Sequence, residues 1–327
     1  MQPPLLCAGT FPIVGRALLH KCRNKGQGLR PVPRLVHAGR FYHRAMNSAS
    51  EPRPGRAPSC AAAIRYCAVA KRYRGRSVLR NVSFAVPANS STAIVGLNGV
   101  GKSTLLRCLL DFTRPDEGQI LIGSRDHGDI RARTQLAWLP ERFVPPSHLT
   151  ARECLRWLAG LRGCDLDTEQ LAATAERLGL ANGVLDRRVG ELSKGMSQKL
   201  GLISISLSQC PIWVLDEPMS GLDPQARRDV SVLLDGARRS GRTLLFTSHE
   251  LRDLPALCDH VVVLHEGEVR FAGTPAELGA RYFDASADGA AASKPAPDLE
   301  AAFLACVRQA HENVGAMRPD VDKEPAP

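Results

Sequence analysis

A glycine-rich segment stands between a short apolar run and a helical pattern. It follows the pattern G-x-x-x-x-G-K-[ST] and ends in Lys102 and Ser103. Glycines let backbone N–H groups converge on a phosphate, and the start of the following helix adds positive potential. The lysine supplies a full charge for terminal phosphates, and the serine hydroxyl can ligate Mg²⁺. We therefore expect an ATP site at Gly96, Leu97, Asn98, Gly99, Val100, Gly101, Lys102, Ser103 and Thr104.

Two adjacent carboxylates, Asp216 and Glu217, close a second apolar run at 212–215. Alternation along a strand would send them to different sides, so they can serve two purposes. Asp216 is the candidate ligand for Mg²⁺, and Glu217 is the candidate base that polarises an attacking water. An acid pair alone can simply open a loop, but a phosphate-binding loop in the same chain favours the catalytic interpretation.

Short apolar strands alternate with helical patterns from about residue 62, which predicts an α/β domain. We expect strands at 64–70, 82–86, 92–95, 119–122, 135–139, 212–215, 243–246 and 261–264, and helices at 101–110 and from 224. Between 150 and 207 the pattern is helical only, and it opens with Thr150 and Glu153 at the spacing of a capping box. This stretch predicts a helical subdomain inserted in the α/β body.

Positive charge is concentrated at one end of the chain. Of the net +10, residues 1–59 hold ten Lys and Arg against one acid, Glu51, so the remainder carries about +1. A nearly neutral body lacks the wide basic face that dominates duplex binding, which disfavours nucleic acid as the main partner.

The two ends of the chain are predicted to lie outside the domain at 60–283. Residues 1–59 are rich in Pro, Gly and Arg without hydrophobic periodicity, which predicts a disordered basic extension. One interpretation of this extension is a transit peptide, and the other is a translated upstream stretch or a flexible tail, with Met46 as the natural start. Composition favours the second interpretation. Residues 284–327 are expected to form a linker and a short amphipathic helix at about 298–311.

Cysteine spacing and hydropathy exclude other classes of protein. The ten cysteines form no C-x-x-C pair, and several lie in apolar periodic segments, as reduced thiols of a cytosolic protein would. Zinc sites and disulfides are therefore disfavoured. No run of 18 apolar residues occurs, so we expect no membrane span.

Five further segments, in this order, resemble the motifs of ABC ATPases over residues 62–282. They are an adenine-stacking Tyr73, a Q-loop at Leu139-Pro140-Glu141, a signature motif at Leu192-Ser193-Lys194-Gly195-Met196, a D-loop at Ser220-Gly221-Leu222-Asp223, and a switch histidine at Thr247-Ser248-His249. The resemblance implies a P-loop NTPase of the ABC-ATPase fold. This fold has a RecA-like α/β core, an N-terminal antiparallel β subdomain and an inserted α-helical signature subdomain, here at about 141–207.

Residue chemistry supports two of the roles that the resemblance implies. Ser193 precedes a helical pattern, so its hydroxyl and the Gly195 N–H would form a second anion site at a helix N-terminus, whether or not Ser193 is also a simple N-cap. In the family this site closes on the γ-phosphate bound by the other subunit. His249 follows the strand at 243–246, where ligands gather in α/β sheets. The family pattern pairs it with Glu217 in hydrolysis.

The remaining implied roles concern the base, the metal and the dimer. Tyr73 would stack on adenine, Glu141 would join Ser103 and Asp216 around Mg²⁺, and Asp223 would belong to the D-loop. Glu141 stands where the family usually has Gln, and it adds a negative charge near the triphosphate. Lys194 and Met196 replace the usual Gly and Gln of the signature motif, and Glu141 with Ser-Lys-Gly-Met resembles ABC-2-type exporters.

These observations predict an ATP-hydrolysing subunit of an ABC transporter, with ATP and Mg²⁺ as cofactors. Export is the favoured direction of transport, and the expected partner is a separate transmembrane permease. We expect the protein to form a homodimer and to lie on the cytoplasmic face of the membrane. The loop at 142–148, with two prolines, would dock on the permease.

The sequence disfavours two functions from other classes. A soluble ABC-type ATPase acting on nucleic acid or ribosomes is disfavoured, because such relatives carry two cassettes or split one with a long coiled coil. This chain has one phosphate-binding loop, and only 91 positions separate Lys102 from Ser193. A non-hydrolysing binding module is disfavoured by the intact set Lys102, Asp216, Glu217 and His249.

Overall fold

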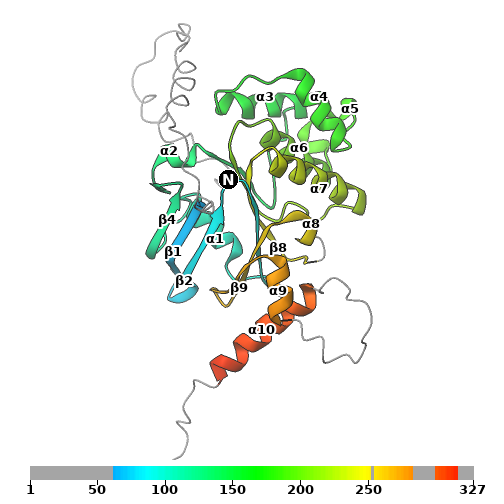
Figure 1. Ribbon diagram of the computed structural model, residues 1–327. Coiled ribbons are helices and arrows are strands. Elements are labelled where there is room, and N and C mark those ends of the chain that lie inside the picture. The colour runs from blue at the N-terminus through cyan, green and yellow to red at the C-terminus, as the bar shows by residue number, and fades with distance from the viewer. Residues whose placement is uncertain (1–61, 252–253, 283–298, 316–327) are drawn as a thin grey trace, which may run out of the picture. The chain divides into compact units, whose positions relative to one another are not determined.

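The computed structural model describes residues 62–251, 254–282 and 299–315. The extension predicted at 1–59 and the linker predicted at 284–297 lie outside the described residues. Within the described part, two sheets and an inserted group of helices match the predicted α/β architecture (Figure 1).

A six-stranded sheet carries the loops that bear the site residues. Its strand order is β10-β9-β3-β8-β7-β6, and every neighbouring pair is parallel except β9 with β10. The strands are β3 (Ser91–Val95), β6 (Leu136–Leu139), β7 (Ile212–Leu215), β8 (Thr243–Ser248), β9 (His260–His265) and β10 (Glu268–Gly273). Because parallel strands end at the same edge, the residues that follow β3, β7 and β8 meet there.

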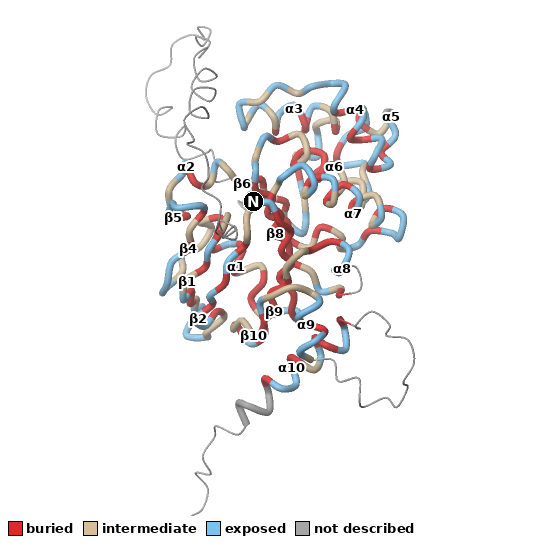
Figure 2. The backbone as a smooth tube through the Cα atoms, in the orientation of Figure 1, coloured by how far each residue is buried: buried red, intermediate tan, exposed pale blue. Residues whose placement is uncertain are grey.

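Both faces of this sheet are covered. Along β3, Ala93 and Val95 join a core with the inserted helices, whereas Ile94 between them joins a second core on the opposite face. All five residues of β3 are buried, as expected for a parallel strand with helices or a second sheet on each side. Figure 2 shows the corresponding concentration of buried residues along β8.

The second sheet is antiparallel and has the order β2-β1-β4-β5. Its strands are β1 (Ala62–Tyr73), β2 (Arg76–Pro87), β4 (Glu117–Ile122) and β5 (Arg125–Asp126), and the short α2 (Ile130–Arg133) follows. Buried residues of this sheet share a core with α1 (Lys102–Leu109), so packing holds the start of α1 in place. The sheet agrees with the predicted N-terminal antiparallel β subdomain.

The inserted helices lie together in Figure 1 and connect β6 to its parallel neighbour β7. They are α3 (Ala151–Leu161), α4 (Thr168–Arg177), α5 (Asn182–Leu185), the 3-10 turn Val189–Glu191 and α6 (Lys194–Ser206). The predicted capping box is present at α3. The Thr150 hydroxyl accepts from Glu153 N at 3.2 Å, and Thr150 N donates to Glu153 Oε2 at 2.8 Å.

Four helices complete the described part of the chain: α7 (Pro224–Arg239), α8 (Leu254–Leu257), α9 (Pro275–Tyr282) and α10 (Leu299–Gly315). α10 packs against α9 and β10 through a buried stripe that includes Leu299, Phe303 and Cys306. The helix expected at about 298–311 is therefore present and four residues longer at its C-terminal end. Among the described residues, no helix combines the length and apolar character that crossing a bilayer requires.

Candidate active site

The glycine-rich loop leads from β3 into α1, as its sequence predicts. A Cβ at Gly96 would lie 2.4 Å from the Leu264 carbonyl oxygen, so a larger residue would collide with the backbone of β9. Gly101 is the residue before α1 and has a φ of 112°, which L side chains rarely adopt. Gly96 is therefore required by the close approach of β9, and Gly101 is required by its backbone conformation.

Lys102 folds back over this loop. Its ammonium donates to the carbonyl oxygen of Gly96 at 2.7 Å and to that of Leu97 at 3.3 Å, and it lies 3.7 Å from Glu217 Oε1. Burial lowers the pKa of Lys102, while the negative charges of Glu217 and Asp216 act in the opposite direction. A buried cation is therefore held beside a helix N-terminus, where phosphate binds well.

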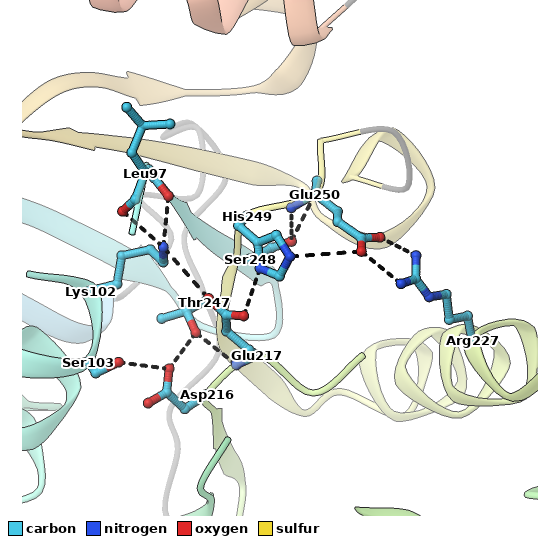
Figure 3. A network of polar contacts seen from close by, with 11 residues as sticks. Leu97, Lys102, Ser103, Asp216, Glu217, Arg227, Thr247, Ser248, His249 and Glu250 are labelled. Carbon is cyan, nitrogen blue, oxygen red and sulfur yellow. Dashed lines mark hydrogen bonds and ion pairs between the residues drawn. The ribbon is translucent and has the colours of Figure 1, made fainter. Parts of the chain in front are cut away.

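Asp216 lies between Ser103 and Thr247 (Figure 3). The Ser103 hydroxyl is 3.4 Å from Asp216 Oδ1, and the Thr247 hydroxyl donates to the same oxygen at 2.7 Å. Thr247 Oγ1 in turn accepts from the backbone N–H of Glu217 at 2.8 Å. One buried hydroxyl from β8 thus holds both the Asp216 side chain and the backbone of the next residue.

Glu217 turns toward Lys102 and His249 instead. Its Oε2 lies 2.7 Å from His249 Nδ1, and its Oε1 faces the Lys102 ammonium. Because His249 directly follows β8, the predicted position of this histidine at a strand end agrees with the structure. The carboxylate is therefore held between two cationic or proton-bearing groups (Figure 3).

The reason why the two acids diverge differs from the sequence-based expectation. β7 ends at Leu215, so Asp216 and Glu217 lie beyond the strand and strand alternation does not separate them. Glu217 has a φ of 46°, in the left-handed region that costs a non-glycine residue on the order of 1–3 kcal/mol. This backbone turn, stabilised by Thr247, points the two carboxylates in different directions.

The oxygen ligands present are compatible with Mg²⁺, although no group of three His, Cys, Asp or Glu capable of holding a metal by itself occurs in the part of the chain that is described. Mg²⁺ usually binds one or two carboxylates and completes its shell with waters and phosphate oxygens. The Ser103 hydroxyl at the start of α1 and the Asp216 carboxylate after β7 lie 3.4 Å apart and fit such a partial shell.

Two other predicted residues lie at the borders of this cluster. Glu141 is exposed just after β6, and its charge is one of those that act on Lys102. Tyr73 ends β1 with 41% of its surface exposed, and the Lys71 ammonium lies 5.5 Å from its ring centroid. Exposure leaves the ring of Tyr73 accessible to a nucleobase, but no hydrogen bond or ion pair among the described residues ties it to the phosphate-binding loop.

The signature motif forms a second cluster. Ser193 is the N-cap of α6, and its hydroxyl accepts from Met196 N at 3.2 Å. Cβ atoms added to Gly195 and Gly221 would approach the Leu222 and Lys194 side chains to 3.5 and 3.2 Å, so this motif lies against the loop at 220–223. Within the described residues, Ser193 forms no hydrogen bond or ion pair with Lys102 or Glu217.

Asp223 ends that loop and begins α7. It is the N-cap of α7 and accepts from Ala226 N at 2.8 Å. This backbone hydrogen bond holds the pKa of Asp223 below its usual value. The structure therefore brings Ser193 and Gly195 against the Asp223 loop, and this loop begins beside the other group, because Ser220 N donates to the Glu217 carbonyl oxygen at 3.0 Å.

Four residues of the network in Figure 3 have no role predicted from the sequence: Thr247, Arg227, Ser248 and Glu250. Thr247 and Ser248 belong to the histidine motif, and the only signal that the sequence offers for them is a hydroxyl residue close before His249. Arg227 and Glu250 are 23 residues apart and form an ion pair. Two single polar residues that are so far apart in the sequence form no local pattern from which their contact could be predicted.

A phosphate-binding loop before a helix, with a buried lysine and a carboxylate pair at the ends of parallel strands, defines the class of P-loop ATPases. The profile of the ABC transporter family matches residues 79–220. The solved structure of an ATP-binding subunit of an ABC transporter has a TM-score of 0.64 and 27% identity, and the match covers 74% of this chain and 98% of that one.

Three relatives specify the class further. The energy-coupling factor transporter ATP-binding protein EcfA2 of Symbiobacterium thermophilum is 34% identical, over 64% of this chain and 76% of its own length. The Nod factor export ATP-binding protein I of Rhizobium leguminosarum is 31% identical over 66% and 70% of the two chains. The aliphatic sulfonates import ATP-binding protein SsuB 2 of Pseudomonas aeruginosa is 34% identical over 62% and 71%. The chain belongs to the family of ATP-binding subunits of ABC transporters, which hydrolyse ATP.

Proposed function

We propose that the cluster around Lys102 is the hydrolytic half of the ATP site. Lys102 and the backbone N–H groups of the phosphate-binding loop would hold the β- and γ-phosphates. Glu217 would accept a proton from the attacking water, with His249 holding the Glu217 carboxylate in position. The observation that carries this assignment is that Glu217 lies between Lys102 at 3.7 Å and His249 at 2.7 Å.

Ser103 and Asp216 would hold Mg²⁺, and Glu141 would contact the ion or one of its waters. When bound, the ion would neutralise charge on the β- and γ-phosphates. Thr247 keeps the Asp216 carboxylate turned toward Ser103, which supports this assignment. Tyr73, exposed at the end of β1, would stack on the adenine ring.

The second cluster would complete the site of another subunit. Ser193 Oγ and the Gly195 N–H lie at the start of the 13-residue helix α6, a position that favours anions. They make no hydrogen bond to the Lys102 cluster within the described part of the chain, which supports contact with a γ-phosphate bound by a second chain. We propose a homodimer with two ATP molecules at its interface and the Asp223 loops beside them.

Membrane transport would require a separate permease subunit. The loop at 142–148 supports such a contact, because Val144 is 67% exposed and two prolines stiffen the segment. This partner would keep the protein on the cytoplasmic face of the membrane. Export is the proposed direction, on the basis of Glu141 and the Ser-Lys-Gly-Met signature.

Substitution of the proposed base tests the hydrolytic assignment. We expect Glu217→Gln to bind ATP normally and to lower turnover by roughly 10²-fold or more, the range of a lost general base. Lys102→Ala serves as the contrasting variant, because it should weaken nucleotide binding itself. ATP turnover and equilibrium nucleotide binding would be measured for the full chain. Turnover of Glu217→Gln within a few-fold of the wild type would remove Glu217 from this role.

A further inference from the structure

A partly buried arginine joins two loops at the edge of the active site (Figure 3). Arg227, on the first turn of α7, donates through Nη2 to Glu250 Oε1 at 2.7 Å, and its Nη1 binds Glu250 Oε2. Its Nε donates to the backbone carbonyl of Leu222 at 3.1 Å. The planar guanidinium therefore ties the loop that precedes α7 to the segment that follows β8.

The same carboxylate lies beside the imidazole of His249. Glu250 Oε1 is 3.9 Å from His249 Nε2, while Glu217 Oε2 is 2.7 Å from the opposite nitrogen, Nδ1. The first distance is too long for a direct hydrogen bond, so Glu250 acts on the ring through its charge. The imidazole consequently lies between two carboxylates, and only one of them belongs to the proposed hydrolytic pair.

Local hydrogen bonds restrict the backbone that carries Glu250. The Ser248 hydroxyl accepts from Glu250 N at 3.0 Å and donates to Glu250 O at 2.8 Å. With this turn fixed, the direction of the Glu250 side chain is set by its two-point contact with Arg227. A guanidinium can make that contact, whereas a lysine ammonium cannot reproduce its geometry.

We propose that Arg227 and Glu250 are positioning residues for ATP hydrolysis, which orient His249 toward Glu217 and link that orientation to the Leu222 carbonyl. The inference rests on the proposed function, since it takes the His249–Glu217 pair as hydrolytic. The contacts of Arg227 also connect the loop at 220–223 with the His249 imidazole. A shift of this loop moves Arg227, and Arg227 moves the carboxylate that faces the ring.

Two conservative variants test the pair in the full chain. Arg227→Lys keeps the charge but loses the two-point contact, and Glu250→Gln keeps the shape but loses the charge. We expect each to lower kcat for ATP by about tenfold, within the range of effects caused by misplaced catalytic groups, with KM and ATP affinity within about twofold of the wild type.

Arg238→Lys is the matched control. Arg238 lies on the same helix with a similarly exposed side chain, 31% against 32% for Arg227, and donates to Asp259 at 2.7 Å and to Asp235 at 2.8 Å. It has no contact with the active-site residues of Figure 3, so kcat should not change. If Arg238→Lys and Arg227→Lys lower kcat equally, the loss reflects a general weakening of α7, and the proposal is wrong.

A double-mutant cycle with His249 separates positioning from a merely structural role. If Glu250 acts through the imidazole, Glu250→Gln should lower kcat in the wild type but cause no further loss in His249→Ala. The same loss in both backgrounds would overturn the proposal. If His249→Ala leaves kcat unchanged, the proposed role of His249 in hydrolysis is wrong, and the positioning proposal is wrong with it. If His249→Ala lowers kcat but Glu250→Gln does not, only the positioning proposal is wrong.

The imidazole also offers a readout without ATP. In a two-bond ¹H–¹⁵N spectrum of the nucleotide-free chain, the His249 signal is assigned by its loss in His249→Ala. We expect Arg227→Lys and Glu250→Gln to shift the His249 ring nitrogens and Arg238→Lys to leave them in place. Unchanged His249 signals in both test variants would contradict the proposal.

Discussion

The hydroxyl of Thr247 connects the two acids of the site at the level of single atoms. It donates to Asp216 and accepts from the Glu217 backbone, and the residue is fully buried. A buried polar group that loses its partner costs about 1–3 kcal/mol, and a hydrogen bond to a charged group contributes a similar amount. Thr247 therefore stabilises both the orientation of Asp216 and the left-handed backbone at Glu217.

We predict that Thr247→Val raises the Mg²⁺ concentration needed for half-maximal ATPase activity by about tenfold, because Asp216 loses the donor that orients it. Thr247→Ser keeps the hydroxyl and should behave like the wild type. The measurement is ATP turnover against Mg²⁺ concentration at saturating ATP. Identical Mg²⁺ curves for the Val and Ser variants would show that the hydroxyl does not support the metal site.

The sequence predicted the site residues whose patterns are local. The phosphate-binding loop spans nine consecutive positions, and the acids are adjacent at the end of an apolar run, so spacing alone places them. The contacts of Thr247, Arg227 and Glu250 join segments that are far apart in the sequence. The pairing of β7 with β8 brings Thr247 to Asp216, and no short-range pattern encodes that pairing.

Most elements were also predictable, because hydrophobic runs and helix caps are local signals. The strand expected at 212–215 is confirmed, and the expected helix start at Pro224 matches α7. β10 was missed. It follows β9 after a two-residue turn, Glu266 and Gly267, and both residues have a positive φ. Glu-Gly is a weaker hairpin signal than Asn-Gly or Asp-Gly, so the turn was not recognised.

The capping box of α3 gives a pH prediction at the level of an element. The hydrogen bond from Thr150 N is the main reason why the pKa of Glu153 lies below its usual value, and the Thr150 hydroxyl contributes in the same direction. A carboxylate with a lowered folded pKa stabilises the protein above its unfolded pKa of about 4.3 and loses this effect as pH falls through the folded value.

Glu153→Gln should therefore have a lower urea midpoint than the wild type at neutral pH. The difference between the urea midpoints of the two proteins should become smaller as pH falls below about 4.3, where the wild-type carboxyl becomes protonated. Urea unfolding of both proteins at several pH values measures this difference. A difference that stays constant down to the lowest pH at which the proteins remain folded would contradict the assignment to the Glu153 charge.

At the level of the whole molecule, the proposed function assigns phosphate contacts to two groups at different helix N-termini of one chain. The Lys102 group lies at the start of α1, and the Ser193 group lies at the start of α6 against the Asp223 loop. The insertion between β6 and β7 supplies α6, whereas β3 leads into α1. In the proposed homodimer, the Lys102 group of one chain and the Ser193 group of the other would together surround one ATP.

The oligomeric state of Glu217→Gln with saturating Mg-ATP, measured by analytical ultracentrifugation, tests the composite site most directly. The account predicts a shift from monomer to dimer, because slowed hydrolysis preserves the ATP that binds the paired form. Adding Ser193→Arg should abolish the shift while ATP binding remains, and Ser124→Arg, the same change on an exposed turn after β4, should not. A Glu217→Gln protein that stays monomeric at saturating ATP and high protein concentration would contradict the homodimer.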